Sequence, residues 1–308
     1  MENLLSLLQI IVPILTCMGL GLLARKRKLI TTEQIGGLQQ FVLKFCMPCV
    51  LFNSCLEAKI SSESLTTMVM LLPVLFLSSL WGFRAKEKYF PYHNFPMLLT
   101  GHETGMLGLP LCIILFGTSQ AYRMGILDMT QGLISIPVMI FLAADTGKGA
   151  SVKEIVKKVL LSPMLIMSVL GFSLGLSGIA DWLDSVGIGQ IIRETTTFLA
   201  QPVSAAMLFT IGFNFVLSGD NRKEIFKISA LALLFAAGAC LIMQGVLCLI
   251  PQVDALTRWV VLLYCALPAS YFAPSLGRTE KETAIASGVC SVMTVVTLIS
   301  FCVIAVFA

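Results

Sequence analysis

Apolar residues along the chain fall into ten long runs, separated by short breaks that are charged or rich in proline and glycine. Each run holds about 20–26 residues, enough for a helix to cross a hydrocarbon core of roughly 30 Å. The pattern therefore predicts an all-α membrane protein with ten transmembrane helices. They are expected at approximately 3–24, 35–57, 64–84, 92–117, 121–143, 155–178, 195–217, 225–250, 256–277 and 283–307.

Composition supports the membrane class. Apolar residues make up 57% of the 308 residues and charged residues 12%, against roughly 45–50% and 25% in soluble proteins. The net charge of +4 is not gathered on one face, so nucleic acid is excluded as a partner. Nine of the ten cysteines lie inside apolar runs, where cysteine acts as a small hydrophobe. The Cys46-Met-Pro-Cys49 pair has no second half-site, so neither a metal nor a redox centre is expected.

Lysine and arginine are unevenly divided between the breaks. One alternate set of breaks holds 16 of them, including the break at 145–158, and the opposite set holds 4, among them Lys59. Since cytoplasmic loops carry the excess of positive charge, both termini should face outward from the cell membrane. Glu2 stands where a secretory signal carries Lys or Arg, so we expect no cleaved signal peptide.

Ten spans divide into two halves of five, 1–147 and 148–308. Because each half has an odd number of spans, the second half has the opposite orientation across the membrane. Weak sequence similarities between the two halves support this inverted repeat. The second span of each half carries a central proline, Pro48 and Pro202, and the fourth carries a Leu-Pro pair at Pro110 and Pro268.

The fourth span is a poor helix. Residues 100–110 contain three glycines, two threonines and a proline, and Gly costs about 1 kcal/mol and Pro about 3 kcal/mol relative to Ala. The ninth span repeats the theme at 266–274 with two prolines. Paired interruptions in corresponding positions point to a transporter binding site near the bilayer midplane. Two half-helix N-termini there would suit an anionic group of the solute.

Several motifs together resemble the auxin efflux carrier family. They are 105–110 with 115–117, 47–52, 127–137, the Leu-Pro pair at 267–268 and the threonine-rich tenth span, and the resemblance covers essentially the whole chain. It implies that helices four and nine are broken and cross at their prolines, beside the site. It also implies a scaffold of helices 1, 2, 6 and 7, often dimeric, against which helices 3–5 and 8–10 move as an elevator. Family substrates are mainly organic anions.

The chain departs from the family at one position. Where the family usually has Asn before Thr-Gly, this chain has Glu103, preceded by His102. A carboxylate there repels an anion unless it is protonated or paired.

Three ionisable residues are the candidates for positions near the bilayer centre: Glu103 and Lys44, near the middle of their spans, and Asp128, about two turns into its span. Each costs roughly 2.5–3.5 kcal/mol at the bilayer centre, which favours a functional role. Our hypothesis is that Glu103 takes up a proton or cation, with its titration governed by desolvation and by His102 or Lys44. Lys44 is also explained by snorkelling, and Asp128 by bonding to freed backbone. The remaining candidates for the substrate or ion site are Thr104, Gly105, Gly108, Pro110, Gln131, Pro268, Ser270, Tyr271 and Asn53.

These features predict a secondary transporter of a small organic solute, without a bound cofactor and coupled to a proton or sodium ion. No nucleophile–base set or phosphate loop is found, so an enzyme is not expected. The alternatives are a sodium-coupled bile-acid-type symporter and a non-transporting sensor on the same fold. Gly171 and Gly175 form a small-x-x-x-small pair that predicts a close helix contact.

Overall fold

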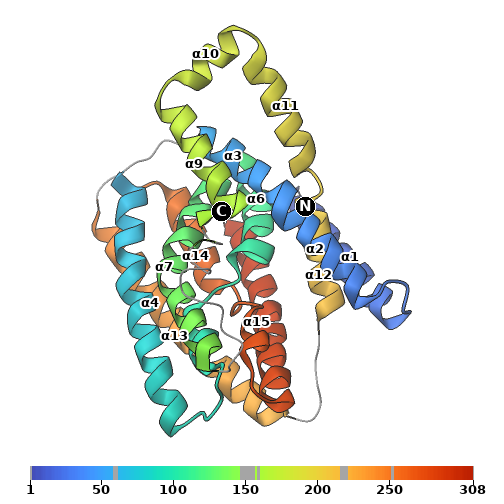
Figure 1. The fold of residues 1–308 in the computed structure, drawn as a ribbon, viewed down its shortest axis with the longest axis vertical. Helices are drawn as coiled ribbons and strands as arrows, with labels where there is room; N and C mark the ends of the chain where they lie inside the picture. The colour runs from blue at the N-terminus through green and yellow to red at the C-terminus, as the bar shows by residue number, and fades with distance from the viewer. Residues whose placement is uncertain are drawn as a thin grey trace. The chain divides into compact units, whose positions relative to one another are not determined.

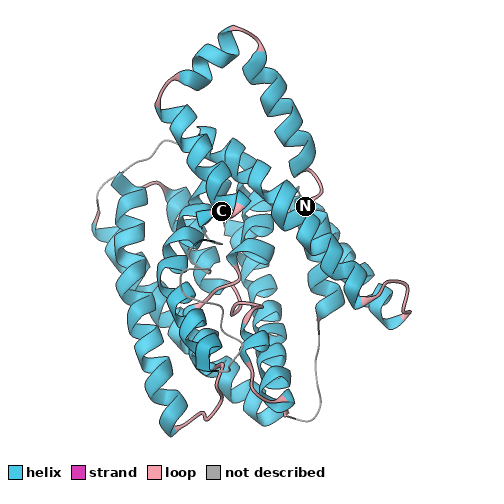
Figure 2. Ribbon diagram, in the orientation of Figure 1, coloured by secondary structure: helices cyan, strands magenta, loops and turns pink. Residues whose placement is uncertain are grey.

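The computed structural model describes residues 2–57, 62–145, 157, 160–215, 221–250 and 253–307. These residues are helical apart from turns, short extended stretches and an isolated β-bridge (Figure 2). The predicted boundary between the halves at 147/148, and Lys59, Lys148, Lys153 and Lys158, lie outside the described residues.

The chain forms two compact units. Unit 1 comprises Met1–Lys59, Leu109–Gly125 and Lys153–Phe215, and unit 2 comprises Ile60–Gly108, Ile126–Val152 and Val216–Ala308. The helices of unit 1 are α1 (Glu2–Lys26), α2 (Thr32–Phe41), the π-helix η1 (Val42–Cys46), α3 (Met47–Glu57), α6 (Leu109–Phe116), η3 (Thr118–Gln120), α9 (Pro163–Leu176), α10 (Ile179–Ser185), α11 (Ile188–Ala200) and α12 (Val203–Asn214). Those of unit 2 are α4 (Ser62–Lys88), α5 (Phe95–Thr100), the π-helix η2 (Thr104–Gly108), most of α7 (Ala121–Asp145), α13 (Arg222–Leu249), α14 (Ala255–Ala266), the 3₁₀ helix η4 (Ala273–Leu276) and α15 (Glu280–Phe307).

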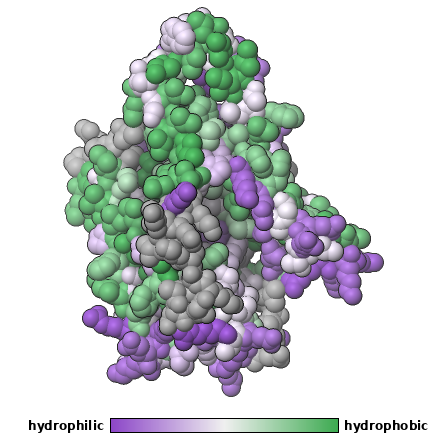
Figure 3. Space-filling model, viewed as in Figure 1, coloured by the Kyte–Doolittle hydropathy of each residue, from purple (hydrophilic) through white to green (hydrophobic). Residues whose placement is uncertain are grey.

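Several helices have the length and apolar composition of membrane spans. Among the described residues, six segments qualify by these criteria, or seven if the bent pair α9 and α10 counts as one. In α4 the large apolar side chains of Leu65, Val69 and Leu77 are more than half exposed. Figure 3 shows hydrophobic surface along α4, and hydrophilic surface at its C-terminal end and at the turn between α1 and α2. This distribution suits helices whose sides face lipid and whose ends face water.

Two close helix pairs build unit 1. Helix α3 packs along α9, and a Cβ added to Gly171 would lie 2.6 Å from the carbonyl oxygen of Phe52. Gly175 likewise faces the Leu56 carbonyl, so the predicted small-residue contact is confirmed. Helix α1 packs along α12, where Gly212 faces the backbone of Met18 (Figure 1). Glycine lets the two backbones approach closely in both pairs.

Helices α9, α10 and α11 form an arch within unit 1 (Figure 1). The sequence pattern gave no helix at 179–194, and this expectation was wrong: α10 and the first half of α11 lie there. Gly178 and Gly187, at φ 74° and 78°, turn the chain at the two N-caps, a conformation that glycine adopts without steric cost. The search for long apolar runs missed these helices because glycines and aspartates interrupt the apolar residues of this region.

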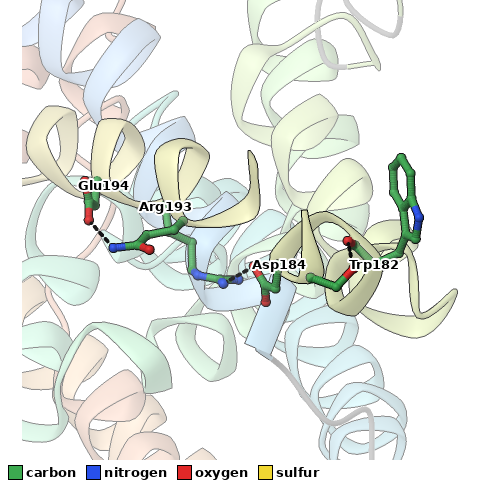
Figure 4. A network of polar contacts seen from close by, with 6 residues as sticks. Trp182, Asp184, Arg193 and Glu194 are labelled. Carbon is green, nitrogen blue, oxygen red and sulfur yellow. Dashed lines mark hydrogen bonds and ion pairs between the residues drawn. The ribbon is translucent and has the colours of Figure 1, made fainter. Parts of the chain in front are cut away.

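A polar network joins α10 to α11 (Figure 4). Arg193 forms an ion pair with Asp184, Gln190 donates to Glu194, and the indole of Trp182 points away from them. Since the side chains of the ion pair are about a third exposed, it contributes little to stability.

Unit 2 has a continuous apolar core. Phe95 stacks on Phe90 with ring centroids 4.7 Å apart, and Trp81 of α4 meets Phe235 of α13 at 4.5 Å. The Asn94 side chain donates to the Glu282 carbonyl at 3.3 Å, which ties the start of α5 to α15. These contacts hold α4, α5, α13 and α15 around the segments described next.

Candidate functional site: a crossover of two broken segments

The fourth predicted span is interrupted where its sequence is richest in glycine. Helix α5 ends at Thr100, residues 101–103 are not helical, and η2 begins at Thr104. Gly101 is extended, with φ −104° and ψ 129°. The predicted break is therefore present, and it lies before the π-helical turn rather than at Pro110, which is the second residue of α6 in unit 1.

The ninth predicted span is interrupted at its proline. Leu267 is extended, with φ −66° and ψ 150°, because the residue before a proline is disfavoured in the helical region. Helix α14 therefore ends at Ala266. The predicted interruption at 266–274 is therefore present, and the part of the span after it, expected to reach 277, is only the short η4 before α15 starts. A second proline, Pro274, lies inside η4.

The two unwound stretches pair with each other in unit 2. The Glu103 N–H donates to the Pro268 carbonyl at 2.9 Å, and the Ser270 N–H donates to the Gly101 carbonyl at 2.8 Å. His102 and Ala269 thus form an antiparallel β-bridge. Backbone that leaves a helix at membrane depth needs such partners, and here each stretch supplies them to the other. We call residues 101–104 and 267–271 the crossover.

Glu103 is held at the centre of the crossover. Its side chain is 8% exposed. Carboxylate oxygen Oε1 accepts from the Met106 N–H at 3.2 Å, and Oε2 accepts from the Tyr271 N–H at 2.7 Å. One side chain therefore satisfies backbone donors on both segments.

Gln131 of α7 connects that helix to the crossover. Its amide donates to the His102 carbonyl at 2.8 Å and to Thr104 Oγ1 at 3.0 Å, and its oxygen accepts from the His102 N–H at 3.0 Å. Thr104 Oγ1 in turn donates to the carboxylate of Asp128. Gln131 and Thr104 are buried, at 6% and 1% exposed, whereas Asp128 is partly buried.

His102 and Glu103 contact different partners. The His102 ring donates through Nδ1 to the Leu267 carbonyl at 3.3 Å and lies 4.8 Å from the Tyr264 ring. It lines an apolar cavity together with Leu71, Ser78, Ala232, Met243 and Cys265. Consecutive residues on extended backbone point to opposite faces, which explains why the imidazole meets this cavity while the carboxylate meets Tyr271.

The other predicted site residues are divided between the two units, with Gly105, Gly108 and Ser270 in unit 2. Gly105 and Gly108 lie in η2, and the Ser270 hydroxyl accepts from Phe272 N–H at 3.3 Å. Lys44 and Asn53 belong to unit 1. Lys44 is exposed and donates to Gln40 at 3.2 Å, whereas Asn53 accepts from Thr196 at 2.6 Å and donates to Thr197. The bonds of Asn53 join α3 to α11.

Two residues that lie beside the crossover were missed by sequence reasoning. The Tyr264 hydroxyl donates to Gln131 Oε1 at 2.9 Å, and Thr294 of α15 contacts the Tyr271 hydroxyl at 2.7 Å. The signal that points to Tyr264 is a polar ring four residues before Pro268 in an otherwise apolar run. Thr294 has no comparable local signal.

Comparison with known proteins assigns the family. A family model described as membrane transport protein matches residues 6–307. No curated protein matches the sequence. Among the described residues, no group of three or more His, Cys, Asp or Glu side chains could hold a metal ion. The match over nearly the whole chain shows that the protein belongs to the membrane transport protein family of auxin efflux carriers.

Proposed function

We propose that the protein is a secondary transporter that moves a small organic solute across the cell membrane by alternating access, with its binding site at the crossover. The observation that carries this proposal is the pairing of two broken segments through the His102–Ala269 bridge. Discontinuous spans that meet beside buried polar side chains are the usual construction of a transporter site. The family match supports membrane transport as the activity.

Ten helices in two inverted halves are the architecture we propose. In such a repeat, span 1 corresponds to span 6 and span 2 to span 7. The contact of α1 with α12 then corresponds to that of α9 with α3, and both are close contacts at glycines such as Gly212 and Gly171. Span 4 corresponds to span 9, so the repeat maps the bridge between these two spans onto the same bridge. This agreement supports the repeat, and the uneven division of Lys and Arg between the breaks supports both termini outside.

We propose an elevator mechanism, which the division of the chain into two units supports. Spans 1, 2, 6 and 7 fall in unit 1 and the crossover falls in unit 2. We propose that unit 1 is the scaffold, through which a homodimer forms, and that unit 2 carries the solute. A non-transporting sensor is the second candidate for the same fold.

Glu103 is the group that we propose takes up the coupling ion, a proton or a sodium ion. Its two acceptor bonds suit the ionised carboxylate, and a proton on Oε2 would weaken the bond to the Tyr271 N–H, which joins the two segments. Uptake of a proton at this oxygen would thereby loosen the crossover. The resemblance implies an organic anion as the solute, whereas Glu103 and Asp128 together favour a solute without negative charge.

The test is solute flux into liposomes that contain the purified protein. A carrier gives saturable flux with counterflow, whereas binding without flux would identify a sensor. Flux that needs sodium would identify the bile-acid-type symporter, and flux that follows the pH gradient would identify proton coupling. The Glu103→Gln variant should lose the pH or sodium dependence, and unchanged coupling in this variant would remove Glu103 from the mechanism.

A further inference from the structure

We propose that Glu103 is an internal anion that occupies the backbone donors of the crossover and so prevents an anionic group of the solute from binding there. The inference gives a substrate class to the site of the proposed function and rests on that function for its biological meaning. It makes Glu103 a specificity-determining residue, in addition to any role in coupling.

The donors come from two distant parts of the chain. The N–H groups of Met106 and Tyr271 both point at the carboxylate of Glu103, one to each oxygen, at 3.2 and 2.7 Å. Two N–H groups on the two oxygens of one carboxylate form charge-assisted hydrogen bonds, the strongest class of bond that a backbone donor makes. A solute carboxylate would need these same donors, and the protein's own carboxylate already holds them.

The charge around the crossover also disfavours the binding of an anionic solute. Asp128 places a second, partly buried carboxyl group next to Thr104. The ion pairs of Arg193 with Asp184 and of Lys281 with Glu224 involve neither Glu103 nor Asp128, which accept hydrogen bonds from Met106 and Tyr271 and from Thr104 and Gln131, respectively. An anionic solute would therefore meet two acidic groups at the crossover, which is unfavourable where solvent is excluded.

If Glu103 fills an anion position, removing its side chain should create a site for a small free carboxylate. Glu103→Ala deletes the carboxyl group and leaves the N–H groups of Met106 and Tyr271 unpaired beside the vacated space. Formate and acetate have the size of the deleted group and can accept both bonds. This outcome does not depend on transport, so it can fail while the transport function holds, and the reverse is also true.

The experiment measures the melting temperature of the full-length protein in detergent, in sodium formate, sodium acetate or sodium chloride of equal ionic strength. Glu103→Ala should melt about 5 °C or more below the wild type in chloride, because two buried donors lose their acceptors. Formate or acetate at about 50 mM should restore at least about half of the loss. The wild type and Glu194→Ala, which deletes an exposed carboxylate on α11, should not distinguish the anions.

Glu103→Ser is the second variant, because its hydroxyl accepts one of the two N–H groups and preserves more of the fold. A response to formate or acetate in either small variant supports the inference. Folded variants that do not distinguish carboxylates from chloride would overturn it. Failure of both variants to fold in any of the three anions would overturn it as well, because a free carboxylate should replace the missing contacts.

Discussion

The carboxylate of Glu103 accepts a hydrogen bond of 2.7 Å from the backbone N–H of Tyr271, 168 residues later in the chain. This bond joins the start of the π-helical turn after α5 to the loop after α14. Both segments have left the helical conformation at this point, so their freed backbone donors need acceptors. Glu103 is therefore a structural link as well as a candidate ion carrier, and variants there should affect both properties.

The hydroxyl of Tyr264 should contribute to the stability of the crossover. Tyr264→Phe removes its bond to Gln131, which we expect to lower the free energy of unfolding by about 1 kcal/mol and the melting temperature by a few degrees. Thermal unfolding in detergent measures this. Tyr89→Phe is the matched control, since that ring is 60% exposed, and an equal loss in both variants would contradict the role given to Tyr264.

The contact between α3 and α9 should not tolerate a side chain at Gly171. In Gly171→Ala the new Cβ would lie 2.6 Å from the Phe52 carbonyl oxygen, so the helices must separate, at an expected cost of about 1–3 kcal/mol. Gly19→Ala in α1, where a Cβ meets no atom within 4 Å, should leave stability unchanged or raise it slightly. A Gly171 variant as stable as the Gly19 variant would show that the packing is looser than described.

Pro268 should keep the ninth span unwound. Pro268→Ala releases Leu267 from its extended conformation, and we expect α14 to lengthen at the expense of the β-bridge. Solute uptake into liposomes should then fall about tenfold or more, equivalent to about 1.4 kcal/mol. The control is Pro73→Ala inside α4, which should leave uptake unchanged. Normal uptake by the Pro268 variant would mean that transport does not require the bridge.

The solute of the wild-type protein should carry no negative charge where it meets the crossover. A screen of thermal stability with organic cations, neutral solutes and organic anions should therefore give increases in melting temperature only in the first two classes. A ligand at about 100 times its Kd adds about 2.7 kcal/mol to the stability of the folded state, which is readily measured. Stabilisation by a carboxylic acid alone would favour the organic anion that the family resemblance implies.

The sequence predicted the features of the fold that depend on local composition. Long apolar runs located the main helices, clustered glycines located the break near Gly101, and Gly171 and Gly175 located a helix contact. The prolines of the ninth span located its interruption after Ala266, but the prediction failed where short helices are punctuated by glycine, as in α10. Such elements depend on tertiary packing more than on an apolar run.

The candidate site was predictable in its residues but not in its pairings. Buried acidic residues are expensive in a membrane, which singled out Glu103 and Asp128. Their partners are the Tyr271 N–H and the Thr104 hydroxyl, and no local pattern links residue 103 to residue 271. The opposite directions of His102 and Glu103 also follow only from the extended backbone, because a helix would have placed them about 100° apart.

Side chains alternate between the two faces of the extended stretch, so its register is as important as its composition. His102 meets the apolar cavity and Glu103 meets Tyr271 because the bridge fixes which residue is opposite Ala269. Deleting or inserting one residue between Phe95 and Gly101 would shift the register and exchange imidazole for carboxylate on each face. The segment can therefore diverge by point substitution far more easily than by a change in length.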